Sequence, residues 1–112
     1  MLIESKEKDA CLVVKLVEKR LDAHISVVFK EKLVGFVNDE QKNIILDLSD
    51  VEFIDSSGLG AIVSALKHIG STGGSLSICG LQDATLSMFK LTRMDKVFNI
   101  YPNENEALAA AA

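Results

Sequence analysis

The chain has 112 residues, a formal net charge of −4 and 48% hydrophobic residues, and this length predicts a single domain over 1–112 that folds without disulfides or metals. The acidic balance and the scattered lysines and arginines argue against nucleic-acid binding, because phosphate backbones are bound by concentrated cations. No apolar stretch approaches the roughly 20 residues of a membrane span, so we expect a cytoplasmic protein that does not bind membranes.

The N-terminal segment predicts a β-hairpin. Residues 2–4 are expected to form a short strand, the charged residues 6–9 its turn, and the β-branched run 11–17 the second strand. The polar residues 18–22 are expected to form an irregular connection.

A helix and a buried strand follow. From about residue 25 to residue 37 apolar residues recur at helical spacing, which predicts one buried face made of Ile25, Val28, Phe29, Leu33, Phe36 and Val37. After a polar loop over 38–42, residues 43–48 carry adjacent isoleucines and leucines. This pattern predicts a strand that is buried on both faces at the centre of a sheet.

The clearest helix follows residues 51–54 and the sequence Asp55-Ser56-Ser57-Gly58. Its apolar stripe keeps the spacing i, i+3, i+4, i+7 and i+10, with the members Leu59, Ile62, Val63, Leu66 and Ile69. The glycines within 70–74 are expected to end this helix, because they accept positive φ.

The last third predicts a strand over 76–79, a helix over 85–91, a strand over 97–101 and a C-terminal helix that begins at 102–103. In the helix over 85–91 the side chains expected to turn inward are Leu86, Phe89 and either Lys90 or Leu91. Strands that alternate with helices after a hairpin predict an α/β sandwich. We expect a small mixed sheet of about four to five strands, with four helices packed mainly on one face.

The turn Asp55-Ser56-Ser57 allows two interpretations. As a structural element, an acid or hydroxyl before an apolar-periodic helix is an N-cap, and Gly58 eases the turn. As a functional element, it offers more polar groups than one cap requires, at a helix end that stabilises phosphate. A phosphoryl group on a serine adds about −1.5 to −2 charges, so the turn is a candidate for a phosphorylation switch.

The helix face opposite the apolar stripe favours the functional interpretation. At about 100° per residue, that face carries Gly60, Ala61, Ser64 and His68. Small side chains beside a modifiable hydroxyl suit the close docking of a partner. A glycine inside a helix costs up to about 1 kcal/mol relative to alanine, which suggests that Gly60 is present for a reason.

The cysteines and histidines of the sequence give little support for metal binding or catalysis. Cys11 and Cys79 lie far apart in apolar runs, so two buried reduced thiols are expected and no metal site. Of the two histidines, His68 lies roughly 18 Å along the helix from Ser56, and a single His24 near a serine is usually incidental. We therefore expect a binding module without catalytic residues or cofactor, with nucleotide binding near Asp22 left open.

Five segments carry a resemblance to a known family: Leu21–Ala23, Ile44–Leu48, Val51–Gly60, Gly73–Leu76 and Met88–Met94. Together they resemble the STAS-domain anti-sigma factor antagonists of bacteria. The resemblance covers nearly the whole chain, and Asp-Ser-Ser-Gly-Leu-Gly is fairly specific in this context.

The resemblance implies a partner-switching cycle. The unmodified protein would bind an anti-sigma factor that is also a Ser/Thr kinase and so release a sigma factor. The kinase would phosphorylate Ser56, the serine directly after the aspartate, and a Ser/Thr phosphatase would restore the active form. From the resemblance and the outward face of the helix together, the expected partner-binding residues are Asp22, Asp55, Ser57, Gly58, Gly60, Ala61 and Ser64.

The segment Lys19-Arg20 departs from the family, which often has a Gly-acidic pair there, and this changes the rim of the docking surface. Related domains serve in stressosomes, as C-terminal parts of anion transporters and in lipid-transport complexes. The alternative function is therefore a constitutive scaffold or assembly subunit, in which the serine turn is only a cap.

Overall fold

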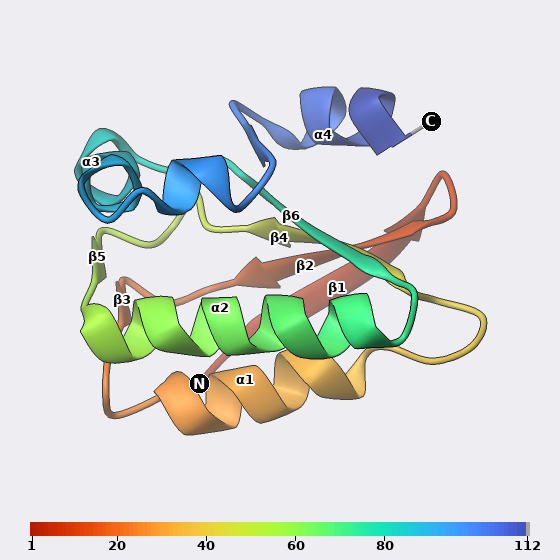
Figure 1. Ribbon diagram of the computed structural model, residues 1–112, viewed down its shortest axis with the longest axis horizontal. Coiled ribbons are helices and arrows are strands. Elements are labelled where there is room, and N and C mark those ends of the chain that lie inside the picture. The colour runs from red at the N-terminus through yellow and green to blue at the C-terminus, as the bar shows by residue number, and fades with distance from the viewer. Residues whose placement is uncertain (112) are drawn as a thin grey trace.

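A five-stranded mixed sheet forms the centre of the molecule (Figure 1), as seen in a computed structural model that describes residues 1–111. Its strands, in spatial order, are β1 (Ile3–Lys8), β2 (Cys11–Leu16), β4 (Asn43–Asp47), β6 (Ser75–Cys79) and β7 (Ile100–Tyr101). β1 is antiparallel to β2, and the remaining neighbours are parallel. A separate parallel pair joins β3 (Arg20–Leu21) to β5 (Phe53–Ile54).

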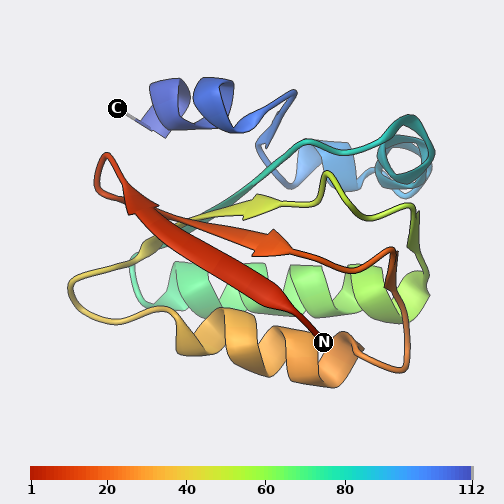
Figure 2. The ribbon, with the colours of Figure 1, turned by 180° about the vertical axis from the view of Figure 1, so that it is seen from behind.

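Within residues 1–111, four helices pack around this sheet: α1 (Ser26–Gly35), α2 (Ser56–Ser71), α3 (Asp83–Leu91) and α4 (Glu104–Ala111), with a 3₁₀ turn η1 (Met94–Lys96) after α3. α1 and α2 lie side by side on one face, and α4 lies on the other, as Figures 1 and 2 show. α3 lies near β5, at the end where the parallel strands finish. The expected mixed α/β sandwich is confirmed, with α4 as the helix on the second face.

The main hydrophobic core lies between the sheet and the α1–α2 layer. Alternate residues of β2, among them Val14 and Leu16, point into it together with Ile44 and Leu46 of β4, because successive strand residues face opposite sides. Ile45 faces the other side and is buried as well. The prediction that residues 43–48 form a central strand buried on both faces is thereby confirmed.

A second, smaller core lies under α4. It consists of Cys11, Val13, Ile45, Cys79, Ala107 and Leu108. An ion pair of 2.9 Å between Lys6 Nζ and Glu104 Oε2 joins the start of α4 to the edge strand β1. Both cysteines are free and buried, as expected from their apolar surroundings. Burial raises the pKa of the Cys11 thiol, and the nearby Asp9 carboxylate adds to this.

Alkaline pH is expected to lower the free energy of unfolding through Cys79. Burial raises the pKa of this thiol from 9.0 to about 12, and the carboxylates of Asp47 and Glu104 contribute further. Between these values the unfolded chain loses the thiol proton while the folded chain keeps it, so stability falls as pH rises above 9.0. Denaturant midpoints should therefore fall less steeply with pH in Cys79→Ala than in the unaltered protein. Equal slopes would contradict this assignment.

The N-terminal hairpin extends further than the sequence pattern predicts. β1 continues through Lys8, so residues 6–8, expected in the turn, belong to the strand. The turn consists of Asp9 and Ala10, whose φ angles of 51° and 66° are those of a tight two-residue hairpin. The prediction was wrong because β1 is an exposed edge strand, where charged side chains are common and no apolar alternation marks the strand.

Two further expectations about elements were wrong. Residues 20–21, expected to be irregular, form β3, which pairs with a segment more than thirty positions later. Residues 97–99, expected to begin a strand, follow η1 instead, and only Ile100 and Tyr101 pair with β6. Strands this short are defined by their partner rather than by their own sequence.

Val28, expected inside, is exposed, and so are both Lys90 and Leu91, of which one was expected to turn inward. Val28 is 45% exposed, because α1 turns the side of Phe29 and Leu33 toward the core. Leu91 is 85% exposed and Lys90 is exposed as well, since α3 buries Thr85 and Phe89 one turn apart. Within residues 1–111, none of the helices is both long and apolar enough to span a bilayer.

Candidate functional site

Asp55 ties the start of α2 to the segment before α1. Its Oδ1 accepts a hydrogen bond from the backbone N–H of Gly58 at 2.8 Å, which caps the helix. Its Oδ2 accepts one from the backbone N–H of Ala23 at 3.2 Å. One carboxylate therefore fixes both the serine turn and the Asp22 segment, two regions that lie 32 residues apart.

Asp22 lies beside the serine turn, as expected, and organises the entry to α1. Its Oδ1 accepts from the backbone N–H of His24 at 3.0 Å, and its Oδ2 from Arg20 Nε at 3.4 Å. Its carbonyl oxygen accepts from the backbone N–H groups of Ile25 and Ser26. Asp22 and Asp55 thus form a rim around the first turn of α2.

Gly58 permits the first turn of α2 to approach β3 closely. A Cβ at this position would lie 2.2 Å from the carbonyl oxygen of Leu21, a contact that no side chain can make. The same oxygen accepts a hydrogen bond from the backbone N–H of Asp55 at 3.2 Å. Glycine is therefore required here by packing, and Gly58 is buried rather than displayed to a partner.

Ala61 also lies on a different side of α2 from the one expected. The helical spacing places it on the outward face, but it is only 8% exposed, because α1 packs against that side of α2. Gly60 and His68 are exposed and Ser64 is half-buried, in keeping with the expected outward face. Near the serines, α2 therefore exposes a narrower strip of its surface than it would if it packed on the sheet alone.

The two adjacent serines are both exposed, and they line different hollows. Ser56 lines a groove between α2 on one side and α3 with η1 on the other. Ser57 lines a smaller hollow between the first turns of α1 and α2, together with Val27, Lys30 and Ala61. A group added to Ser56 would therefore enter the α2–α3 groove, whereas one added to Ser57 would face α1.

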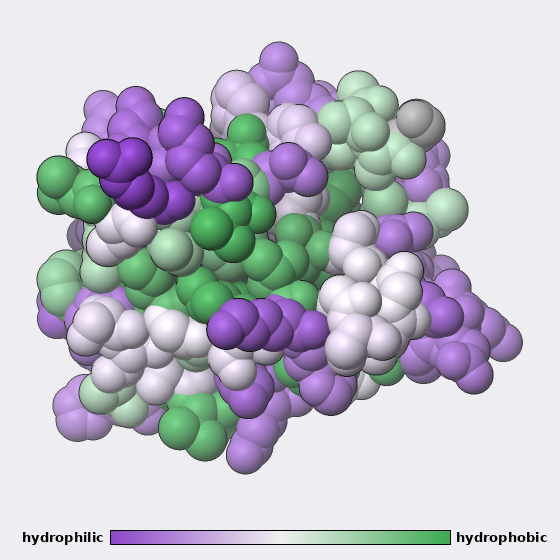
Figure 3. Space-filling model, viewed as in Figure 1, coloured by the Kyte–Doolittle hydropathy of each residue, from purple (hydrophilic) through white to green (hydrophobic). Residues whose placement is uncertain are grey.

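The α2–α3 groove has a volume of about 420 Å³ and a mainly apolar lining. Figure 3 shows apolar surface in the region between α2 and α3. The lining residues are Ser56, Leu59, Gly60, Val63, Ser64, Lys67, Met88, Thr92 and Met94. Methionine side chains adapt to many partner shapes, which suits a docking surface. Sequence reasoning did not assign Lys67, Met88 or Met94 to the site. Lys67 lies on α2 itself, whereas the proximity of Met88 and Met94 to Ser56 depends on how α3 and η1 pack.

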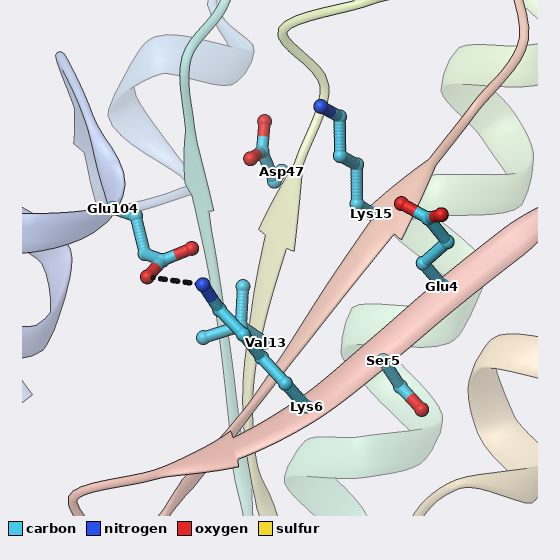
Figure 4. A pocket seen from close by; sticks show the side chains of 7 residues that line it. All are labelled: Glu4, Ser5, Lys6, Val13, Lys15, Asp47 and Glu104. Carbon is cyan, nitrogen blue, oxygen red and sulfur yellow. Dashed lines mark ion pairs between the residues drawn. The ribbon is translucent and has the colours of Figure 1, made fainter.

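A larger hollow of about 670 Å³ lies on the opposite face of the sheet, beside α4 (Figure 4). It is lined by Val13 and otherwise by polar or charged residues, including the ion-paired Lys6 and Glu104. Its charges are mixed in sign, and none of its residues belongs to the serine turn. We therefore centre the candidate site on the groove at Ser56. In the described part of the chain, no three His, Cys, Asp or Glu side chains are grouped to hold a metal ion.

The chain is similar to known proteins over nearly its whole length. A family model described as the STAS domain matches residues 3–107. An anti-sigma F factor antagonist of Paenibacillus polymyxa is 31% identical over 107 residues, which are 95% of this chain and 91% of that protein. An anti-sigma-B factor antagonist of Listeria monocytogenes is 31% identical over 104 residues, covering 93% and 91%. The crystal structure of an anti-sigma factor antagonist from Mycobacterium paratuberculosis superimposes with a TM-score of 0.85 at 26% identity, covering 97% and 92%.

Proposed function

The chain belongs to the STAS domain family, and from this premise we propose that it is an anti-sigma factor antagonist whose binding is switched off by phosphorylation of Ser56. In its unmodified form it binds an anti-sigma factor of the Ser/Thr kinase type, which then releases its sigma factor. The bound kinase phosphorylates Ser56, and a Ser/Thr phosphatase later restores the hydroxyl. The cycle takes place in the cytoplasm.

One observation carries this proposal: the exposed Ser56 hydroxyl opens into an apolar groove that a partner can fill. Beside Ser56, the rim that Asp22 and Asp55 form around the first turn of α2 is held by hydrogen bonds from backbone N–H groups to the two carboxylates, so this part of the surface is organised without a partner. Preorganised surfaces lose less conformational entropy on binding. The proposed contact surface comprises Asp22, Asp55, Gly60, Ser64 and the methionines of the groove, while Gly58 and Ala61 support it from below.

Phosphorylation would act locally rather than by refolding the chain. A phosphoryl group brings about −1.5 to −2 charges to a position next to the Asp55 carboxylate. The positive end of the helix dipole offsets only about 0.3–1 kcal/mol of the resulting repulsion. A partner that had closed over a neutral hydroxyl would have to desolvate the new charge inside an apolar groove, which opposes binding.

The proposal predicts where the phosphate is placed. The purified chain is incubated with each kinase-type anti-sigma factor of its source organism, with ADP or with ATP, and complexes are separated by size-exclusion chromatography. We expect a complex with ADP, its loss with ATP, and a phosphate on Ser56 by mass spectrometry, because Ser56 and not Ser57 faces the groove. Ser57→Ala serves as the control and should still be phosphorylated.

Two results would revise this picture in different ways. Phosphate on Ser57 would overturn the residue assignment and leave the switch itself in place. Binding that is equally tight with ADP and with ATP, without modification, would favour a constitutive scaffold in which Asp55 and the serines only cap α2.

A further inference from the structure

Arg20 and Phe53 form an ordered platform on the rim of the site. The guanidinium carbon of Arg20 lies 4.2 Å from the centroid of the Phe53 ring, well within the range of a cation–π contact. The two residues face each other across the β3–β5 pair. Both are exposed, and Phe53 is 42% exposed although its neighbour Ile54 is buried. An exposed aromatic ring held beneath a cation is not explained by the packing of the core.

The guanidinium group retains free donors. Arg20 Nε donates to Asp22 Oδ2 at 3.4 Å, and over residues 1–111 the two Nη groups have no hydrogen-bond acceptor. The ring of Phe53 and the carboxylate of Asp22 therefore hold the side chain while its outer edge stays open. That edge presents paired N–H groups that match a carboxylate in bidentate geometry.

The neighbouring Lys19 has a different environment. It lines a separate hollow whose other lining residues include three acidic ones, Glu18, Asp50 and Glu52. Arg20 has Asp22 as its ion-pair partner among the described residues. Arg20 and Lys19 thus carry the same charge at adjacent positions but reach different surfaces.

The platform is continuous with the proposed binding surface. Phe53 lies two residues before Asp55. Asp22 accepts hydrogen bonds from Arg20 and from the backbone N–H of His24, and the adjacent Ala23 N–H donates to Asp55. Figure 1 shows β3, β5 and the first turn of α2 at the same end of the molecule. Arginine and aromatic residues are enriched among those that dominate binding energy at protein interfaces.

We propose that Arg20, held on Phe53, binds a carboxylate of the anti-sigma factor and thereby selects partners that carry an acidic side chain at the matching position. This inference rests on the proposed function, because it concerns the same partner and the same end of the molecule. The docking partner is a folded protein, and the recognised group is a single carboxylate. The arginine edge supplies two parallel hydrogen bonds to it.

The test measures the affinity of the anti-sigma factor that binds the unaltered chain, by calorimetry in ADP at low and at high salt. Arg20→Ala is expected to weaken binding roughly 30-fold, the size of an interface hot spot, and to reduce its dependence on salt. Arg20→Lys should restore part of the affinity, since it keeps the charge and loses the planar fork. Phe53→Leu should weaken binding less than Arg20→Ala does, because it frees the guanidinium without removing it.

Lys19→Ala is the matched control, because it removes the same charge from the adjacent residue. Its affinity should stay within about threefold of the unaltered chain, as expected for a charge outside the central contact. If Arg20→Ala binds the anti-sigma factor as tightly as Lys19→Ala does, the inference is overturned and the proposed function stands. If the unaltered chain binds none of the organism's kinase-type anti-sigma factors, the proposed function and this inference fail together.

Discussion

Ser56→Asp is expected to abolish stable binding to the anti-sigma factor, with a loss of affinity of roughly 30-fold to several thousand-fold. The estimate follows from the 2–5 kcal/mol that an unpaired buried charge typically costs at an interface, at 1.4 kcal/mol for each factor of ten. The new carboxylate would stand at the entrance of the apolar α2–α3 groove, where Ser56 is one of the lining residues. Affinity is measured by calorimetry in ADP, so that no phosphorylation takes place.

Two controls separate this effect from a loss of structure. Ser56→Ala should bind like the unaltered chain, because it adds no charge and Ser56 is exposed. The thermal midpoint of Ser56→Asp should be equal or slightly higher, since an acidic residue in the first turn of a helix is favourable by about 0.3–1 kcal/mol. Ser57→Asp should weaken binding less, because Ser57 lines the hollow beside α1. Equal losses for both serines would show that the groove does not decide the effect.

Gly58→Ala is expected to lower the free energy of unfolding by about 3 kcal/mol, at the upper end of what overpacking costs. The added Cβ would lie 2.2 Å from the carbonyl oxygen of Leu21 and 2.9 Å from its Cγ. The nearest atom belongs to the backbone of β3, so relief requires β3 to separate from the first turn of α2. That movement would also weaken the hydrogen bond from the Asp55 N–H to the same oxygen. Urea titration at neutral pH measures the change.

Gly60→Ala provides the comparison at a glycine two residues further along the same helix. No atom lies within 4 Å of the Cβ it would add, and Gly60 is exposed. Replacing an unconstrained helical glycine with alanine is expected to raise stability by up to about 1 kcal/mol. Because Gly60 lines the groove beside Ser56, the same methyl group should reduce partner affinity. If both glycine variants changed stability equally, the close approach of Leu21 would not be the reason for Gly58.

Elements with strong local patterns could be predicted from the sequence. The apolar stripe that begins at Leu59 predicts α2, and the sequence before it offers Asp55 as a possible cap of that helix; both are confirmed. The adjacent isoleucines and leucines of residues 43–48 predicted the central strand β4. In each case the apolar pattern repeats within a short run of residues, so it predicts which side chains are buried even when the segment that packs against them is unknown.

Elements defined by distant partners were missed or misplaced. β3 has two residues and exists only by pairing with β5. Helical spacing predicts Ala61 on the outward face, because spacing shows which residues share a side of α2 but not that α1 covers a second side of that helix. The apolar groove also depends on a distant contact, since Met88 and Met94 reach Ser56 only through the packing of α3 and η1.

The amino-acid sequence by itself determined the sandwich of strands and helices, the cap at Asp55 and the presence of two adjacent hydroxyls at the start of α2. Only the tertiary structure decided which hydroxyl faces the groove, why Gly58 must lack a side chain and how Arg20 comes to lie on Phe53. The physical reason is the separation along the chain of the residues that produce each feature. Periodicity and capping are properties of a few consecutive residues, whereas these three features arise from segments about thirty residues apart that meet when the sheet and helices pack.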